Sequence, residues 1–170
     1  TSQPTNLYAG KKMEEVKLLP LYQTCYSQNV SMVSRRAVEV VGGFDTSYYA
    51  MYEEADFGYR LKKAGFKMLL ATSAITHHMG AVGDSSSVLL RRYGIESPER
   101  AWHFAKNRCI FERKYAKWYE KGIFFLSFFH LFTLFYCMMA LKEHRADVAK
   151  AYLKGAWYGA FKKIDKSGEN

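Results

Sequence analysis

The first 97 residues alternate short apolar runs with glycines and polar clusters, a pattern typical of short strands and helices. Residues 1–20 show no clear period and are expected to form a loop. Gly42-Gly43 and Gly65 each follow a helical pattern, where glycine favours a C-terminal stop. The pattern predicts a strand over 30–34, a helix over 35–41, a helix over 53–64 and a strand over 66–71 that residues 74–77 extend.

Residues 98–170 are patterned as helices almost throughout. Ser97-Pro98-Glu99 combines an N-cap serine, a proline in the first turn and an early acid, so we expect a helix from Pro98 to about Lys121. A last helix starts near Arg145 and is amphipathic and basic. Its lysines lie off an apolar stripe that consists of Ala149, Tyr152, Leu153, Ala156, Trp157, Ala160, Phe161 and Ile164.

A chain of 170 residues is long enough for one modest domain with its own core. Its net charge of +9 is uneven, because residues 1–97 hold 11 Lys and Arg against 9 Asp and Glu, whereas residues 98–170 hold 14 against 7. We therefore divide the chain into a region 1–97 and a basic helical region 98–170. Three scattered cysteines without Cys-x-x-Cys spacing argue against a disulfide framework or a cysteine zinc site, and they are typical of a reducing cytoplasm.

The segment 123–141 contains no charged residue and has three interpretations. A helix of about 20 residues is long enough to cross a bilayer core, and a buried helix of a soluble protein is the second possibility. Basic residues on both flanks favour the third, a monotopic helix that lies in the membrane surface beside the basic last helix. A weakly polar stripe supports it, formed by Ser127, His130, Thr133 and Cys137. Nucleic acid is not expected as a partner, because acids alternate with the basic residues and no nucleic-acid motif is present.

Acidic side chains gather at the start of the predicted helix that follows Tyr52. Glu53, Glu54 and Asp56 fall in its first turn, where unpaired N–H groups and the helix dipole stabilise anions. A carboxylate held there can take a proton from a hydroxyl, and the downstream pair His77-His78 can bind a divalent metal. This combination indicates a catalytic site; the alternative is that the acids only favour the start of the helix.

The order of these motifs resembles the second half of family-2 inverting glycosyltransferases, in particular the bacterial rhamnosyltransferase-like group that builds surface polysaccharides. The likeness covers roughly residues 28–115 and is carried by Ser31–Arg36, Val41–Asp45, Glu53–Asp56, Gly65-Phe66 and His77. It implies an α/β fold, namely the C-terminal part of a Rossmann-like nucleotide-diphospho-sugar transferase domain, followed by a helical membrane-associated tail. It also implies that a donor-binding half with an Asp-x-Asp motif precedes Thr1.

The resemblance implies roles for the acids of residues 45–56. Glu54 is the expected catalytic base, with Glu53 as its neighbour and Asp56 as an orienting or structural acid. The family carries Asp or Glu at the position of Glu54, and glutamate reaches one methylene further. Asp45 is expected to shape the turn after Gly43 or to line the acceptor pocket.

The resemblance also places a divalent cation, Mn²⁺ or Mg²⁺, beside His77, with His78 as the alternative ligand. The glycine- and serine-containing segment 79–87 is either a lid over the nucleotide or a surface connector. The expected contacts to the diphosphate or the acceptor are Arg91, Arg92, Asn107 and Arg108, with Lys106 beside them; solvent-facing or membrane-facing roles are the alternative.

The resemblance thus predicts an inverting glycosyltransferase. It would move a sugar from a nucleotide-diphosphate donor to a lipid-linked saccharide, at the cytoplasmic face of the cell membrane, in cell-surface polysaccharide synthesis. Because the donor-binding half is expected upstream, the chain alone is expected to be inactive. The alternative is a non-catalytic basic module that docks on membranes.

Overall fold

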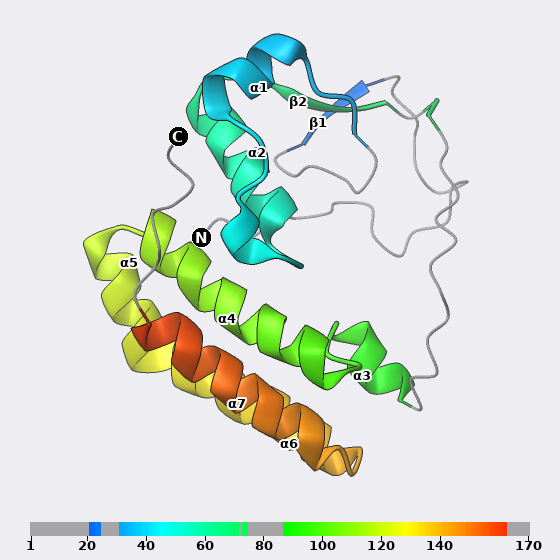
Figure 1. The fold of residues 1–170 in the computed structure, drawn as a ribbon, viewed down its shortest axis with the longest axis vertical. Helices are drawn as coiled ribbons and strands as arrows, with labels where there is room; N and C mark the ends of the chain where they lie inside the picture. Colours follow the sequence, from blue (N-terminus) through cyan, green and yellow to red (C-terminus); the bar gives the residue numbers. More distant parts are fainter. Residues whose placement is uncertain (1–20, 25–30, 72, 75–86, 163–170) are drawn as a thin grey trace. The chain divides into compact units, whose positions relative to one another are not determined.

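The computed structural model describes residues 21–24, 31–71, 73–74 and 87–162, which belong to two compact units. Unit 1 consists of Thr1–Asp45 and Glu53–Gly80, and unit 2 consists of Thr46–Tyr52 and Ala81–Asn170. The chain therefore leaves unit 1 after Asp45, contributes the loop 46–52 to unit 2, and returns to unit 1 at Glu53. Figure 1 labels the helices and strands of both units.

Unit 1 contains two strands and two helices in its described part. A small apolar core joins the helices and consists of Ala37, Phe57 and Leu61. The strands pair in antiparallel register, with Leu21 opposite Ala71. The elements are β1 (Leu21–Thr24), α1 (Arg35–Val41), α2 (Glu53–Lys63) and β2 (Met68–Ala71).

The strand predicted over 30–34 is wrong for residues 31–34, which form neither strand nor helix. Ser34 instead caps α1, because its Oγ accepts a hydrogen bond from the Ala37 N–H at 3.2 Å. The partner of β2 is β1, which the sequence pattern did not indicate. Both predicted helices of this unit are confirmed.

The C-terminal end of α2 shows why a glycine stands at position 65. Gly65 has a φ of +85° and its N–H bonds to the Lys62 carbonyl at 3.1 Å, while the Phe66 N–H bonds to the Leu61 carbonyl at 3.0 Å. This pair of hydrogen bonds is the Schellman motif, in which a left-handed residue ends the helix. The predicted stop at Gly65 is therefore confirmed.

Unit 2 is helical in its described part. Its core is built by side chains from α3, α4, α6 and α7, among them Leu90, Ala105, Tyr136 and Tyr152. In Figure 1, α4 and α7 run beside each other, with α6 against α7. The elements are the single turn η2 (Thr46–Tyr48), α3 (Val88–Arg92), α4 (Pro98–Tyr115), α5 (Trp118–Ile123), the π-helical turn η3 (Phe124–Phe128), α6 (Phe129–Lys142) and α7 (Ala146–Phe161).

The start of α4 is confirmed, and its predicted end is wrong. Ser97 caps the helix by accepting the Arg100 N–H at 3.2 Å, and Pro98 occupies the first turn. The helix ends at Tyr115 rather than near Lys121, because Ala116 and Lys117 adopt extended backbone. The Glu120 carboxylate accepts the Lys117 N–H at 2.8 Å and so satisfies the start of α5.

Two glycines allow α7 to lie directly on the backbone of α4. A Cβ on Gly155 would stand 2.3 Å from the Trp102 carbonyl oxygen, and one on Gly159 would stand 2.3 Å from the Lys106 carbonyl oxygen. Real Cβ atoms do not approach oxygen so closely, so only glycine fits at both positions. This contact fixes α4, whose polar face carries the residues described below.

The expectation of an α/β fold is met only in its coarse form. Helices dominate the described residues, and the sheet that they contain has two antiparallel strands. The parallel strands of a Rossmann-like domain are not among these residues.

Candidate functional site

Three acids stand in the first turn of α2, as the sequence predicted. Glu53 and Glu54 are half-buried, whereas Asp56 is fully buried. The orientation of the helix places all three at its positive end, where negative charge is stabilised. Asp45 is half-buried as well and ends the segment of unit 1 that precedes the loop 46–52.

Asp56 takes part in a contact between the two helices of unit 1. Its carboxylate pairs with the Arg60 guanidinium at 2.7 Å, one helical turn further along. Arg60 also donates hydrogen bonds to the carbonyl oxygens of Val41 and Gly43, the latter at 2.7 Å. We name these contacts the Arg60 clamp. The clamp ties the end of α1 to α2, and the Asp56 carboxylate is part of it.

The two remaining acids of α2 differ in their contacts. One carboxylate oxygen of Glu53 is buried and has no hydrogen-bond partner. Burying a carboxylate oxygen without a hydrogen-bond donor costs free energy. Such an oxygen usually has a donor, so this atom of Glu53 is an open acceptor position in the described structure. Glu54 follows it directly and is partly accessible to solvent.

The loop 46–52, which precedes these acids in the chain, has unusual backbone geometry. Tyr49, Met51 and Tyr52 have φ values of +29°, +64° and +72°. Positive φ is unfavourable for residues with a Cβ, and large aromatic residues pay this cost fully. Three such residues within four positions need strong support from their surroundings.

Residues of α4 supply this support. The Asn107 side-chain amide donates to the carbonyl oxygens of Tyr48 at 3.0 Å, Ala50 at 2.6 Å and Met51 at 2.8 Å. The Lys106 ammonium donates to the Ser47 carbonyl at 3.1 Å and lies 4.8 Å from the centre of the Trp102 ring. Burial lowers the pKa of Lys106. We name these four hydrogen bonds the loop anchor.

Arg108, the next residue of α4, is enclosed by aromatic side chains. Its guanidinium donates to the hydroxyls of Tyr52 at 3.2 Å, Tyr136 at 3.4 Å and Tyr152 at 3.5 Å. It also lies 4.4 to 5.2 Å from the ring centres of Phe104, Phe132 and Tyr136. We name this arrangement the Arg108 cage.

The electrostatics of the cage keep Arg108 charged. Burial alone would lower the pKa of Arg108, but the hydroxyls of Tyr52, Tyr152 and Tyr136 raise it above its ordinary value overall. In turn, burial raises the pKa of Tyr52 and Tyr152 despite the nearby cation. The cage therefore keeps the Arg108 guanidinium positively charged.

His103 is a polar residue of α4 that the sequence analysis did not single out. Its ring stacks on Tyr49 of the loop with centroids 5.1 Å apart, and its Nδ1 is buried without a hydrogen-bond partner. Burial, and secondarily Lys106, lowers the pKa of His103. The signal was present in the sequence, because His103, Lys106 and Asn107 recur at helical spacing within α4.

The other predicted contacts fall on different parts of the chain. Arg91 and Arg92 stand in the last turn of α3 and are exposed to solvent. His77, His78 and residues 79–86 lie outside the described residues. No group of three potential metal ligands occurs among the residues that the structure describes. The contacts of Asn107 and Arg108 with a diphosphate or acceptor stay predictions.

The helix from Trp118 to Lys142 exposes an apolar surface. It comprises α5, η3 and α6, is long and apolar enough to cross a membrane, and buries only 17% of its most apolar window. A core helix of a soluble protein would be mostly buried. We name its exposed side chains the apolar face, formed by Ile123, Leu126, Phe128, Leu131, Leu134, Phe135, Met138 and Leu141.

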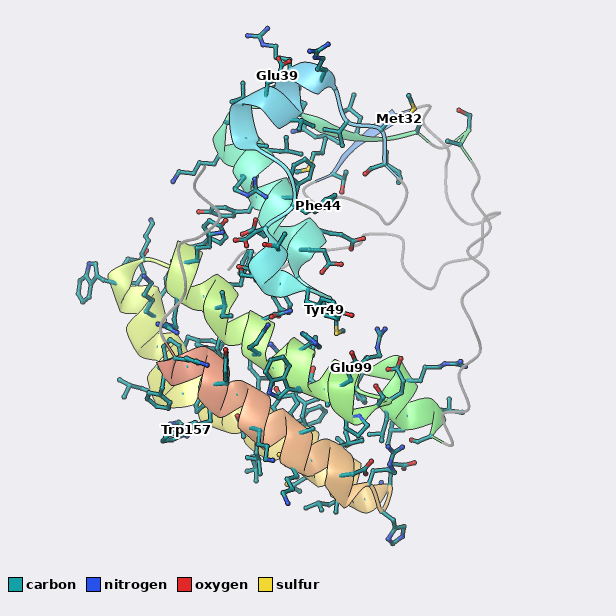
Figure 2. All side chains as sticks on the ribbon, viewed as in Figure 1. Met32, Glu39, Phe44, Tyr49, Glu99 and Trp157 are labelled. Carbon is teal, nitrogen blue, oxygen red and sulfur yellow. The ribbon has the colours of Figure 1, made fainter. Side chains whose placement is uncertain are left out.

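The predicted stripe of the last helix divides into two parts. Ala149, Tyr152 and Ala156 are buried against the core of unit 2. Leu153, Trp157 and Phe161 are exposed instead, and Figure 2 shows Trp157 on the outer side of α7. Ile164 lies outside the described residues. α7 thus adds exposed apolar side chains and the exposed Lys150 and Lys154 to the surface of unit 2.

We compared the chain with protein-family models, with curated proteins and with solved structures, and none of the three comparisons found a match.

Proposed function

We propose that the chain is the acceptor-side part of an inverting glycosyltransferase that works at the cytoplasmic face of a membrane. The donor is a nucleotide-diphosphate sugar, the acceptor is a lipid-linked saccharide, and the product belongs to cell-surface polysaccharide synthesis. In this proposal the chain completes a Rossmann-like transferase domain together with residues that precede it. Glu54 is the catalytic base.

The proposal is supported chiefly by the different contacts of the three acids of α2. Asp56 is committed to the Arg60 clamp, so it fixes the helix that presents Glu53 and Glu54. The positive end of the helix stabilises a carboxylate there, and a rigid helix places a side chain more precisely than a loop does. The strained loop that leads into this turn is a further feature typical of functional regions.

The chemistry that this arrangement can perform is proton removal from an alcohol. The Glu54 carboxylate would accept the proton of the acceptor hydroxyl while the hydroxyl oxygen bonds to the anomeric carbon of the sugar. The bond between that carbon and the diphosphate oxygen breaks on the opposite face, which inverts the configuration. A divalent cation, Mn²⁺ or Mg²⁺, with His77 as its proposed ligand, supplies positive charge for the leaving phosphates when bound.

Membrane attachment is supported by the apolar face and the basic residues around it. Lys117 and Lys121 stand before the uncharged segment, and Lys142 and Arg145 follow it. A helix with an apolar face and basic flanks binds an anionic bilayer surface in two ways: its apolar side chains are buried among the lipids, and its basic residues are attracted to the anionic headgroups. A lipid-linked acceptor would be presented at that surface.

Transfer assays on the full-length protein test the proposal. With a panel of sugar nucleotides and a polyprenyl-diphosphate-linked saccharide, Glu54→Gln should lower turnover by about 100-fold or more, because the amide cannot accept the proton. Glu39→Gln is the matched control, since Glu39 lies on the exposed side of α1 (Figure 2) and, within the described part of the chain, forms an ion pair with Arg35. Near-normal turnover of Glu54→Gln would remove Glu54 from the role of base.

A second candidate function is a non-catalytic module that docks on membranes, which the apolar face favours. The two functions are distinguished by vesicles of anionic phospholipid. Salt-sensitive binding of the wild type, lost in Leu134→Asp on the apolar face, combined with no transfer by the full-length protein, would favour the docking module. If the wild type failed to bind these vesicles at low salt, membrane attachment would be contradicted for both candidate functions.

A further inference from the structure

Unit 2 contains an open cavity that the proposed transfer chemistry does not use. Its volume is about 240 Å³. Because sites for drug-sized ligands usually measure about 300–1,000 Å³, this cavity fits a small chemical group rather than a whole large ligand. The lining side chains come from α4, η3, α6 and α7 and are Arg113, Phe125, Phe129, His130, Ala160 and Phe161.

Arg113 brings positive charge to the cavity, and part of its guanidinium is already bound. Its Nη1 donates to the carbonyl oxygens of Gly159 at 2.9 Å and of Lys162 at 2.7 Å. The carbonyls at this end of α7 lack partners within the helix and carry partial negative charge. The Nη1 group, which has two hydrogens, therefore caps α7 and has no hydrogen left for a ligand.

The opposite edge of the same guanidinium has the donors that recognise oxyanions. In the described part of the chain, Nε and Nη2 of Arg113 make no hydrogen bond. Their N–H groups form the planar fork that binds two oxygens of a phosphate or carboxylate at once. His130, a member of the weakly polar stripe, lines the cavity and has an N–H donor even when it is neutral. None of the described lining residues is acidic, so the cavity favours an anion.

The walls of the cavity are aromatic and include the π-helical turn η3. The Phe129 N–H bonds to the Phe124 carbonyl, five residues back, where an α-helix would use the fourth. Such turns occur frequently at functional sites. Phe125 and Phe129 both line the cavity, with ring centres 5.9 Å apart. A hydrated inorganic ion gains little from such walls, whereas an anion joined to hydrocarbon buries apolar surface against them.

Exposed apolar side chains flank the cavity. Leu126 and Phe128 belong to η3 and are exposed members of the apolar face. Phe161 lines the cavity and is exposed as well. An occupant can therefore place a charged group at Arg113 and leave a long apolar chain against these side chains. A membrane phospholipid has this combination of phosphate and hydrocarbon.

We propose that this cavity is a binding site for the phosphate group of an anionic phospholipid. The Nε–H and Nη2–H groups of Arg113 and the ring of His130 donate to phosphate oxygens, and the acyl chains lie along the apolar face. The site gives the chain a specific headgroup contact in addition to the general membrane attachment proposed above. It does not depend on sugar transfer.

Titration of the full-length protein with dihexanoyl-phosphatidylglycerol, kept below its micelle concentration, tests the site. The measured quantity is the NMR signal of the Arg113 Nε–H group, which Arg113→Lys identifies because lysine lacks this group. The lipid should shift this signal in a saturable way. Inorganic phosphate is the comparison, and it should bind at least about 10-fold more weakly because it has no chain to bury. No shift with the lipid, or equal affinity for the two ligands, would overturn the proposal.

Filling the cavity separates this site from lipid that adsorbs elsewhere on the protein. Ala160→Leu adds bulk inside the cavity and keeps both Nη1 bonds of Arg113, so it should weaken lipid binding by about 10-fold or more. Ser127→Leu is the control, because Ser127 is an exposed residue of η3 that is not among the described lining residues. Its lipid affinity should equal that of the wild type. Equal affinity of Ala160→Leu and the wild type would contradict the site.

A second variant covers the case in which Ala160→Leu does not fold. His130 is exposed, so His130→Leu should leave the fold intact and remove one phosphate donor, with a loss of about threefold in lipid affinity. Unchanged affinity of this variant would contradict the proposed set of donors. The outcome is separate from that of the proposed function: a protein that transfers no sugar but binds the lipid at Arg113 keeps this inference. A protein that transfers sugar while its Arg113 signal ignores the lipid loses it.

Discussion

The two units each contain an arginine that matters for their structure, and the two are satisfied in opposite ways. In unit 1, Arg60 pairs with the buried Asp56 and with two backbone carbonyls. In unit 2, Arg108 contacts tyrosine hydroxyls and the faces of aromatic rings. The first arrangement relies on charge neutralisation and the second on polarisable, weakly polar partners.

This difference indicates which kind of interaction stabilises each unit. Among the described residues of unit 1, three apolar side chains are buried in the core between α1 and α2, and the Arg60 clamp joins the same two helices. Unit 2 has an extended core and close packing of α7 on α4, and its arginine is one contact among many. Substitutions in the two units should therefore differ in size and in how far their effects spread.

The largest effect is expected from breaking the Arg60 clamp. Arg60→Leu removes the cation that pairs with the buried Asp56 carboxylate and the donor to two backbone carbonyls, which should destabilise unit 1 by about 3–5 kcal/mol. Arg35→Leu is the control, because its pair with Glu39 is exposed and worth at most about 1 kcal/mol. Denaturant unfolding, monitored through the hydrogen exchange of the amides of α2, measures the loss of stability in both variants. Equal effects of the two substitutions would contradict the clamp.

The next effect concerns the close packing of unit 2. Gly155→Ala places a Cβ 2.3 Å from the Trp102 carbonyl oxygen, so α7 must move away from α4. We expect a loss of about 1–3 kcal/mol, as for other overpacked sites. Gly122→Ala has no atom near its added Cβ and should be neutral or stabilising, by up to about 1 kcal/mol. Thermal unfolding compares the two; a stable Gly155→Ala protein would refute the contact.

A smaller effect should follow from changing the Arg108 cage while keeping its charge. Arg108→Lys preserves the cation but loses the planar group that reaches three hydroxyls and stacks on the rings, at a cost of about 1–2 kcal/mol. If instead charge alone mattered, as in an ordinary ion pair, lysine would restore wild-type stability. Denaturant titration followed by tyrosine fluorescence decides between these outcomes.

The smallest effect is a pH dependence in unit 2. Burial lowers the pKa of His103 in the folded chain, so the neutral imidazole is favoured there. This contribution to stability is fully present above the unfolded pKa of 6.5 and is lost as the pH falls through the lower folded value. His103→Phe keeps the stacking on Tyr49 and should flatten the decline in stability between about pH 7 and pH 5. If the stability of His103→Phe declined with falling pH as steeply as that of the wild type, this role of His103 would be contradicted.

Local signals in the sequence predicted much of the local structure. Ser97 and Pro98 marked the start of α4, and Gly65 marked the end of α2. Each of these features depends on residues within one or two helical turns. Their physical causes are therefore visible in a short stretch of sequence.

Features that depend on distant residues could not be predicted in this way. The contacts of Asn107 join residues that are 56 to 59 positions apart, and β1 pairs with a strand more than 40 residues away. The break at Ala116 and Lys117 lacks the glycine or proline that usually marks the end of a helix. The apolar stripe of α7 was found, but which part of it is buried depends on α4 and α6.

The most direct test of the central claim compares Glu54→Gln with Glu53→Gln in a single-turnover transfer assay on the full-length protein. The two residues are neighbours in the same helical turn, so both variants keep its shape and lose one negative charge. We predict a loss of about 100-fold or more for Glu54→Gln and a loss of less than about 10-fold for Glu53→Gln. The reverse order, or near-normal transfer by Glu54→Gln, would contradict the assignment of the base.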